Sequence, residues 1–357
     1  MRLMANLSAR TVATLSTLMV LTTFHGQTIK WLIPQGALSS EGSAVANDGT
    51  AVVIAEFQGS SGRYVDSYYT SACGGGSLRW FGGPSNIRLL SISEATDSQG
   101  RKYVCGWFNS GGLYGIPRNP LSSLQGNIQG YYFMSISTDG RISAGHDPSG
   151  NSVYWDGNKL FTIGGVRYVR ACDSIVPFAV FAGRGIQPSW HGGPSATDRE
   201  FHCVRMIGPQ SFIAGGQGFI TYGTAVSDFV SLPQFGSYTD PIAYSIAKVG
   251  DKVIAVGSAG GRAVRWTYNM QKQLISFEDL TAVYADILPS GTVLQTARCI
   301  SPNGRWIIGT GINGSTGRRE AFLLDTYRLP SDINGDGVVD DADLLQVLFD
   351  FGRTICP

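Results

Sequence analysis

The chain has 357 residues, of which 15% are charged and 47 are glycine, and its formal net charge at pH 7 is +1. This balance gives no reason to expect a nucleic-acid partner, because such binding needs a basic surface that neutralises phosphates. Low charge and abundant glycine favour short strands joined by tight turns over helices, in two or three domains or one large all-β domain with additions.

The N-terminal segment has the pattern of a secretory signal. Arg2 and Arg10 supply positive charge, and residues 11–24 form an uncharged, mostly apolar stretch of 14 residues. That stretch is short for a bilayer span but suits the core of a signal peptide. We therefore expect residues 1–26 to be a signal peptide, with an uncleaved anchor as the alternative. The mature chain would then be extracellular or at the cell surface, without a transmembrane segment.

Six cysteines follow this segment: Cys73, Cys105, Cys172, Cys203, Cys299 and Cys356. An even number in an exported chain permits disulfides, although six cysteines allow 15 pairings. Four of them (Cys105, Cys172, Cys203 and Cys299) lie in apolar, strand-like runs, where small buried thiols are at least as reasonable as bonds. The sequence contains no Cys-x-x-Cys pair, so it gives no indication of zinc.

The central part of the chain contains an internal repeat. Each copy is an apolar strand, a turn with glycine that usually follows Asp or Asn, and a second apolar strand. Such turns favour tight hairpins because these residues tolerate positive φ. The copies lie at residues 43–55, 90–106, 133–145, 244–257 and 299–309, with turn glycines Gly49, Gly100, Gly140, Gly250 and Gly304.

The spacing of these glycines leaves room for two degenerate copies, at residues 171–183 and 203–215, which makes seven units. A third strand often ends in tryptophan (77–80, 152–155 and 262–266), and residues 159–164 suggest a fourth strand. Four short strands per unit at this period predict an all-β propeller of seven blades over residues 28–325, with a β-solenoid as the alternative. Residues 28–33 form an orphan strand, which we expect to pair with the last blade and close the ring.

The repeat resembles the HAF repeat of extracellular and autotransporter-associated bacterial proteins. The resemblance extends patchily over residues 43–324. The best match comprises Ile300, Ser301, Gly304, Ile308 and Gly309, followed by Glu320, Ala321 and Phe322. Residues 263–266 match the end of another copy. The resemblance implies a fold and an extracellular bacterial location, and it implies no particular chemistry.

Acidic residues are concentrated near the C-terminus, where residues 331–357 hold six of the 26 acids and one of the 27 bases. Residues 332–343 place oxygen ligands at positions 1, 3, 5, 9 and 12, with the carbonyl of position 7 and a glycine, Gly337, at position 6. This is the ligand spacing of a calcium-binding EF-hand loop. The predicted Ca²⁺ ligands are Asp332, Asn334, Asp336, Val338, Asp340 and Asp343.

This loop, with Asp at position 12 and an apolar helix after it, resembles one repeat of a type I dockerin. We expect residues 326–331 to be a linker and residues 332–352 to be a dockerin-like half-repeat. The resemblance implies a cohesin-like or other cell-surface protein as partner. One such repeat is present where a dockerin has two, and Asp341 and Ala342 occupy its partner-contact positions. A terminal cap, a sorting tag or a self-pairing module are therefore the alternatives.

The sequence contains no recognisable catalytic motif, neither a Gly-x-Ser-x-Gly elbow nor a His-x-x-x-His pair. His146, His191 and His202 are interpreted as structural. Tyr64, Tyr68 and Tyr69, in an apparent insertion, are candidates for sugar or peptide contacts, although packing is the more ordinary role of such rings. The sequence therefore favours a non-catalytic surface-binding or scaffold protein, with a polysaccharide or surface ligand. The alternative is a carbohydrate-active enzyme, a glycoside hydrolase or lyase, tethered through the dockerin-like module.

Overall fold

A computed structural model describes residues 27–83, 86–122, 124, 126–189, 199–224 and 228–326, together with Asp341, Leu344, Leu345 and Leu348. Its strands form six sheets, and every strand pair with a described register is antiparallel. Within each sheet the strands follow one another along the chain, with β1 as the exception. The sheets share a central cavity, which is lined by the first strands of all six. This arrangement is a β-propeller, as the repeat predicts.

The strands have the following bounds. The first sheet contains β2 (Ser39–Val45), β3 (Ala51–Gly59), β4 (Gly62–Tyr69) and β5 (Arg79–Trp80); the second contains β6 (Ile87–Thr96), β7 (Lys102–Asn109), β8 (Leu113–Pro120) and β9 (Ile128–Gln129). The third contains β10 (Tyr132–Ile136), β11 (Ser143–His146), β12 (Asn151–Trp155), β13 (Leu160–Ile175) and β14 (Phe178–Pro188); the fourth contains β15 (Phe201–Gly208), β16 (Ser211–Gly216), β17 (Phe219–Gly223) and β18 (Phe229–Ser231).

The fifth sheet contains β19 (Ile242–Val249), β20 (Lys252–Ala259), β21 (Arg262–Asn269) and β22 (Leu274–Asp279), and the sixth contains β23 (Val293–Ile300), β24 (Trp306–Ile312), β25 (Arg319–Asp325) and β1 (Thr28–Leu32). Two short helical segments are η1 (Ala72–Gly74) and α2 (Leu280–Val283). The side chain of Asp279 caps α2 by accepting from the backbone N–H of Thr281 at 2.8 Å.

The expected number of seven blades is wrong as a count of sheets, because the described residues form six. The discrepancy arises in the third sheet, where β13 is long. Its first part pairs with β12 and its second part pairs with β14, so the predicted unit at 171–183 is joined to the preceding sheet. The third sheet consequently contributes both β10 and β13 to the cavity, and seven strands line it.

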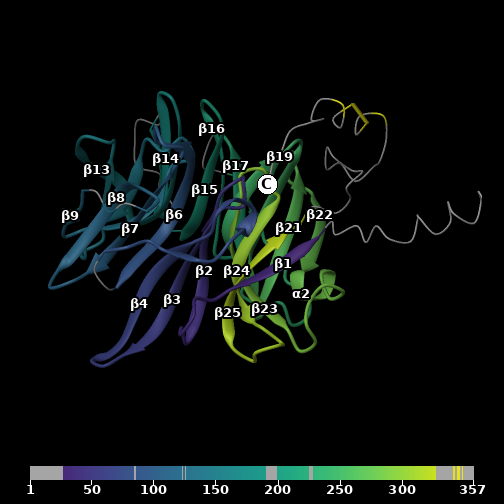
Figure 1. The fold of residues 1–357 in the computed structure, drawn as a ribbon. Helices are drawn as coiled ribbons and strands as arrows, with labels where there is room; N and C mark the ends of the chain where they lie inside the picture. The colour runs from purple at the N-terminus through teal and green to yellow at the C-terminus, as the bar shows by residue number, and fades with distance from the viewer. Residues whose placement is uncertain are drawn as a thin grey trace, which may run out of the picture. The chain divides into compact units, whose positions relative to one another are not determined.

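Ring closure occurs as predicted. The N-terminal strand β1 is the outermost member of the last sheet, where it is hydrogen-bonded beside β25 (Figure 1, purple against yellow-green). The ring of Trp31 in β1 lies edge-on to that of Phe322 in β25, with 6.3 Å between the centroids. Closure pairs the outer edge of β25 with β1, and a hydrophobic cluster that includes Val53 and Trp306 joins the first sheet to the last.

The turn glycines occupy equivalent positions, which confirms that part of the repeat. Gly49, Gly140 and Gly304 have φ values of 77°, 69° and 76°. The N–H of each donates to the carbonyl three residues earlier, at 3.0, 2.9 and 2.9 Å respectively. Each turn joins the first strand of a unit to a buried second strand.

A serine stabilises two of these turns in the same way. The hydroxyl of Ser137 donates to Asp139 Oδ1 at 2.6 Å and accepts from the N–H of Ile142 at 3.0 Å. Ser301 makes the corresponding bonds to Asn303 Oδ1 at 2.6 Å and from the N–H of Trp306 at 2.9 Å. These bonds explain why Ser-x-Asp/Asn-Gly recurs: the serine and the Asp or Asn together satisfy the polar groups of the turn.

A β-bulge recurs in the first strand of each unit. The register shifts by one residue between Leu89 and Ser91 and again between Ala243 and Ser245, and corresponding irregularities occur in the other inner strands. A glycine in the second strand faces the bulge in six of the seven strands. The six are Gly106, Gly145, Gly183, Gly216, Gly257 and Gly309, and a Cβ added to any of them would collide with the carbonyl oxygen two residues before the bulged residue.

Two expectations about the first unit are wrong. Residues 77–80, expected as a third strand, contribute β5, which is the fourth strand of the sheet. The third strand is β4, which holds Tyr64, Tyr68 and Tyr69 and is not an insertion. Tyr64 and Tyr68 pack beside Phe57, with ring centroids 5.4 and 5.9 Å away, and Tyr69 is buried. The tyrosines therefore pack as ordinary strand residues. The sequence did not reveal β4 as the third strand because it lacks the tryptophan that marks β12 and β21.

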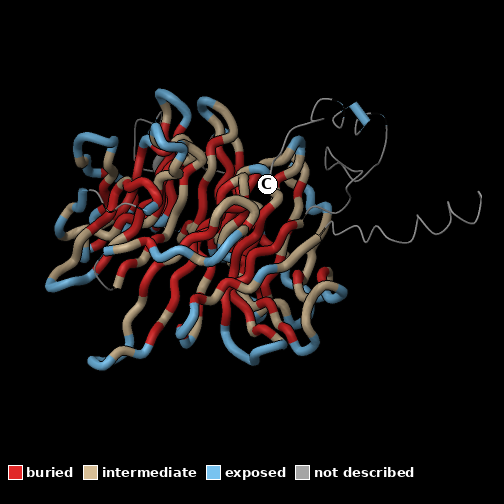
Figure 2. Tube along the Cα trace, viewed as in Figure 1, coloured by how far each residue is buried: buried red, intermediate tan, exposed pale blue. Residues whose placement is uncertain are grey.

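The hydrophobic core is distributed between neighbouring sheets. One cluster joins Val52 and Tyr69 of the first sheet to Leu89 and Val104 of the second, and another joins the fifth sheet to the sixth around Phe322. Buried backbone follows the strands, while exposed segments lie at the turns (Figure 2). Face-to-face packing of sheets is thus the main source of apolar burial.

The C-terminal region is described only in part. Asp341, Leu344, Leu345 and Leu348 are helical, and the three leucines are 54–64% exposed. All six predicted calcium ligands lie outside the described residues, as does the predicted signal segment 1–26. Among the described residues, no helix has both the length and the apolar character needed to cross a membrane.

The bulge geometry leads to a stability prediction. Gly257→Ala should lower the free energy of unfolding by about 1–3 kcal/mol, because the new methyl group would overlap the carbonyl oxygen of Ile242. Gly164→Ala is the matched control, since Gly164 lies in β13 with no atom within 4 Å of an added Cβ. It should change stability by less than about 0.5 kcal/mol. Denaturant unfolding of both variants would measure this, and equal midpoints would contradict the role assigned to the glycine.

Candidate functional site in the central channel

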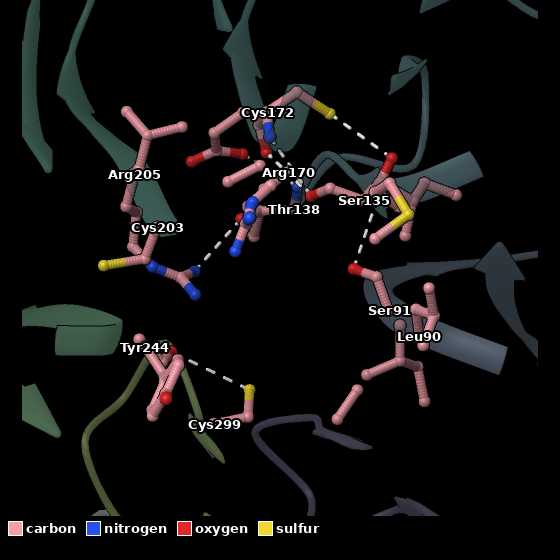
Figure 3. A pocket seen from close by; sticks show the side chains of 18 of the residues that line it. Leu90, Ser91, Ser135, Thr138, Arg170, Cys172, Cys203, Arg205, Tyr244 and Cys299 are labelled. Carbon is pink, nitrogen blue, oxygen red and sulfur yellow. Dashed lines mark hydrogen bonds between the residues drawn. The ribbon is translucent and has the colours of Figure 1, made fainter. Parts of the chain in front are cut away.

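The cavity at the centre of the propeller has a volume of about 180 Å³ and is lined by seven strand segments. Figure 3 shows side chains from several of these segments around it, among them Leu90, Arg170 and Tyr244. Because each segment comes from a different inner strand, residues far apart in the sequence meet here. At this cavity a small ligand, or the tip of a large one, could contact all seven inner strands.

The residues at the bulges form a ring in the lining. A bulge re-aims the side chain of the extra residue, which explains why this position faces the cavity in every unit. Arg170 lies within the wider irregularity between Arg167 and Ala171. The seven residues, called the bulge ring below, are Ser43, Leu90, Met134, Arg170, His202, Tyr244 and Arg298.

One half of the bulge ring is cationic and aromatic. Arg170 forms an ion pair with Glu200, and its Nη1 lies 3.0 Å from His202 Nδ1. The His202 ring is 5.4 Å from that of Tyr244, centroid to centroid. The guanidinium of Arg298 lies over the Tyr244 ring, 5.0 Å from its centroid, in a cation–π contact. These contacts connect four successive inner strands.

The other half of the bulge ring is small or apolar, with Ser43, Leu90 and Met134. The hydroxyl of Ser43 donates to the carbonyl of Leu89 at 2.8 Å, so it joins two inner strands. Next to the bulge ring, Ser91 and Ser135 accept from the backbone N–H groups of Ile136 and Cys172 at 3.2 and 3.1 Å. The apolar half is therefore firmly held and presents mainly hydrocarbon to the cavity.

The protonation state of His202 follows from its surroundings. Burial, with the positive charges of Arg170 and Arg298, lowers the pKa of His202 to about 4, so the ring is neutral near pH 7. A guanidinium can only donate, so Nδ1 of His202 accepts from Arg170 and its Nε2 carries the proton. Burial among the surrounding strands also lowers the pKa of Arg298, although solvent in the channel still reaches this side chain.

The two carboxylates in the lining join neighbouring strands. Glu94 accepts from the N–H of Asn47 at 2.8 Å and from Lys102 Nζ at 3.2 Å. Asp173 accepts from the N–H groups of Thr138 and Met206 at 2.8 and 2.9 Å. Both oxygens of each carboxylate are thus engaged, which is the arrangement of a structural group rather than of a general acid or base that is available to a ligand.

Two cysteines in the lining, Cys172 and Cys203, are poor nucleophiles. Cys105, Cys172, Cys203 and Cys299 are free thiols, which decides between the two roles that the sequence left open; the first three are buried and Cys299 is half-buried. Burial raises the pKa of Cys172 and of Cys203 to about 12, so both remain protonated thiols near pH 7. Cys73 is disulfide-bonded, and Cys356 lies outside the described residues.

The structure revises the interpretation of the histidines. His202, expected to be structural, belongs to the cationic half of the bulge ring. His146 packs between Tyr132 and Tyr168, with centroid distances of 5.5 and 5.4 Å, as a structural residue would. His191 lies outside the described residues. No group of three or more His, Cys, Asp or Glu residues that could hold a metal ion occurs in the described part of the chain.

Sequence reasoning missed Arg170, Tyr244 and Arg298 as site residues, although a usable signal was present. In every unit the bulged residue directly precedes a small residue (Ala44, Ser91, Ser135, Ala171, Cys203, Ser245 or Cys299). Alignment of the units on this small residue would have placed all seven side chains at one equivalent position. The bulged residues differ in charge and size from one unit to the next, so a search for repeated residue types does not detect the position.

No protein-family model and no curated protein matches this chain. Among solved structures, a chain in the crystal structure of the mitotic checkpoint complex matches over 84% of this chain and 91% of its own length, with a TM-score of 0.54 and 12% identity. The β-propeller domain of Cps50 (Swd1) from Myceliophteria thermophila matches over 83% and 99%, with a TM-score of 0.49 and 11% identity. At 12% identity, the first likeness concerns the fold alone.

The environment of His202 predicts a pH dependence of stability. Its pKa falls from 6.5 in the unfolded chain to about 4 in the folded protein. Between these values the unfolded chain binds a proton that the folded protein does not, so acidification favours unfolding. His202→Gln should therefore lose less stability between pH 7.5 and pH 5 than the wild type, by about 1–2 kcal/mol.

Thermal and denaturant unfolding at both pH values would measure this difference. His146→Gln, which replaces a histidine outside the bulge ring, is the control for the substitution itself. An identical loss of stability in His202→Gln and the wild type would show that the ring is protonated freely in the folded protein.

Proposed function

We propose that the protein is a secreted or cell-surface, non-catalytic binding or scaffold protein of bacterial type. Its propeller recognises a ligand at the bulge ring, and residues 332–352 form a calcium-stabilised, dockerin-like attachment module. The observation that carries the proposal is the division of the ring into a half that donates hydrogen bonds and a half that is apolar. Such a lining suits recognition of a polar group on an organic body.

The chemistry of the lining supports binding over catalysis. A glycosidase of the usual kind needs two carboxylates that face the scissile bond. Glu94 and Asp173, the carboxylates in the lining, are each engaged by two donors from the protein. This cavity therefore gives no support to the alternative of a tethered carbohydrate-active enzyme. A binding protein does not need such a pair of carboxylates.

Export is supported by the signal-like pattern of residues 1–26 and by one covalent feature. Cys73 is disulfide-bonded, and structural disulfides persist mainly in oxidising compartments outside the cytosol. The four free thiols are compatible with the same location because three of them are buried and the fourth is half-buried.

The attachment module is proposed from the ligand spacing of residues 332–343 and from the helix that should follow it. Asp341, Leu344, Leu345 and Leu348 are helical, and the leucines expose apolar side chains that would suit a protein partner. A cohesin-like or other cell-surface protein is the proposed partner of this module. A polysaccharide or another surface molecule is the proposed ligand of the propeller.

Calcium binding is the first test. The full-length protein should bind one Ca²⁺ with measurable heat in a calorimetric titration, and saturation should stabilise the C-terminal module. At a hundredfold excess over the dissociation constant, the gain is about 2.7 kcal/mol by mass action. Asp336→Ala should abolish the heat, because it removes a predicted ligand at position 5 of the loop.

Asp341→Ala is the matched control, since it removes a neighbouring carboxylate at position 10, which supplies no ligand in this spacing. It should retain calcium binding. Equal heats from the wild type and Asp336→Ala, or no heat from the wild type at millimolar Ca²⁺, would refute the calcium site.

Recognition by the bulge ring is the second test. The purified protein should be retained on bacterial cell-surface polysaccharide without releasing reducing ends. Met134→Arg should abolish retention, because the longer charged side chain would occupy the cavity from its apolar half. Leu274→Arg introduces the same charge on β22, the outermost strand of its sheet, and should leave retention unchanged.

Two results would overturn this assignment. Retention that is equally strong in Met134→Arg would place recognition outside the bulge ring. Release of reducing ends that is lost on Glu94→Gln or Asp173→Asn would instead establish the enzyme.

A further inference from the structure

The cationic half of the bulge ring contains one positive charge without a matching negative group. Arg170 is neutralised by its ion pair with Glu200. Arg298 makes no hydrogen bond or ion pair within the described part of the chain, and its contact is the face of the Tyr244 ring. The carboxylate of Glu41, which acts on Arg298 electrostatically, is itself paired with Arg319.

The polar groups around Arg298 are donors. The guanidinium carries five N–H groups, and Nε2 of neutral His202 carries one more because its Nδ1 accepts from Arg170. The hydroxyl of Tyr244, whose ring lies between these two side chains, can also donate. A ligand group that accepts several hydrogen bonds and carries negative charge would satisfy all of them.

The setting makes an anion favourable here. The strands around Arg298 partly remove its hydration, which disfavours its charge and lowers its pKa. An anion beside the guanidinium would offset that cost. The planar fork of a guanidinium matches a carboxylate with two parallel hydrogen bonds.

We propose that the bulge ring binds a ligand through a single carboxylate, which pairs with Arg298 and accepts hydrogen bonds from His202 and Tyr244. This assignment rests on the proposed function of the ring and specifies its ligand class. Arg205, which also lines the cavity, donates to the carbonyl of Ile246 and to Thr138 Oγ1, whereas Arg298 has no hydrogen-bond acceptor within the described residues, so a single carboxylate matches Arg298. Leu90 and Met134, on the apolar half, contact the organic body of the ligand, and the volume of about 180 Å³ limits that body to a small molecule or one sugar residue.

The test compares two acids with their neutral counterparts on the full-length protein. The pairs are phenylacetate with phenylacetamide, whose body is apolar, and galacturonate with galactose, whose body is a sugar. Calorimetry or ligand-observed NMR should show that at least one acid binds about tenfold or more tightly than its neutral counterpart, as a charge-assisted pair requires. The pair that shows the difference identifies whether the carboxylate comes from a free organic acid or a uronic acid.

Arg298→Met should remove the preference for the acid, because it retains much of the side-chain length without the charge. Arg298→Lys should restore part of it, since the charge returns without the fork. Arg63→Met, at a side chain that is 66% exposed in β4, controls for the loss of one positive charge and should leave binding unchanged. Circular dichroism and the unfolding midpoint establish that each variant is folded.

The proposal fails if neither acid is preferred over its neutral counterpart, or if Arg298→Met retains the preference. Such a failure is distinct from failure of the proposed function. If Met134→Arg still abolishes retention on the cell-surface polysaccharide, the bulge ring remains the recognition site and only its carboxylate chemistry is wrong.

Discussion

The propeller depends on hydrogen bonding between strands from opposite ends of its sequence. Without β1, the edge of β25 would lack a partner, and the buried faces of the last sheet would lose Trp31 from their core. An unpaired strand edge is a site for association with other chains, and closure removes it. The cavity is lined by inner strands from every sheet of the closed ring, so the bulge ring depends on this closure. The closing contact joins Trp31 and Phe322, which are almost 300 positions apart in the sequence.

Within the closed ring, the site is built by backbone irregularity rather than by a special loop. A bulge aims one residue of each inner strand at the cavity, and in six of the seven a glycine on the next strand leaves room for the displaced carbonyl. Engaged carboxylates and serines then join neighbouring inner strands. Strand-joining contacts and ligand recognition are therefore assigned largely to different residues of the same strands, which leaves Tyr244 and Arg298 available to a ligand.

Much of the fold could be predicted from the sequence because its turns are chemically explicit. Gly49, Gly140 and Gly304 have positive φ and are flanked by apolar strands, so the hairpins could be predicted. The closing strand could be predicted because the strand expected at residues 28–33 belongs to no repeat. The number of sheets could not be predicted, since nothing in the sequence of 160–175 shows that β13 continues from one unit into the next. The site was equally hidden: whether His202 and Arg298 face the cavity depends on a one-residue shift of register, which local patterns of hydrophobicity do not reveal.

The residues of the bulge ring differ from the residues that shape the inner strands. A substitution at a bulged position changes the surface of the cavity, while the glycine, the small neighbouring residue and the turn that shape the strand remain in place. Seven such positions, each on its own strand, act as independent sites of variation around one cavity. Related propellers could thus diversify their ligand preferences by point mutation alone, much as antibody loops vary on a constant framework, without an insertion or a new loop.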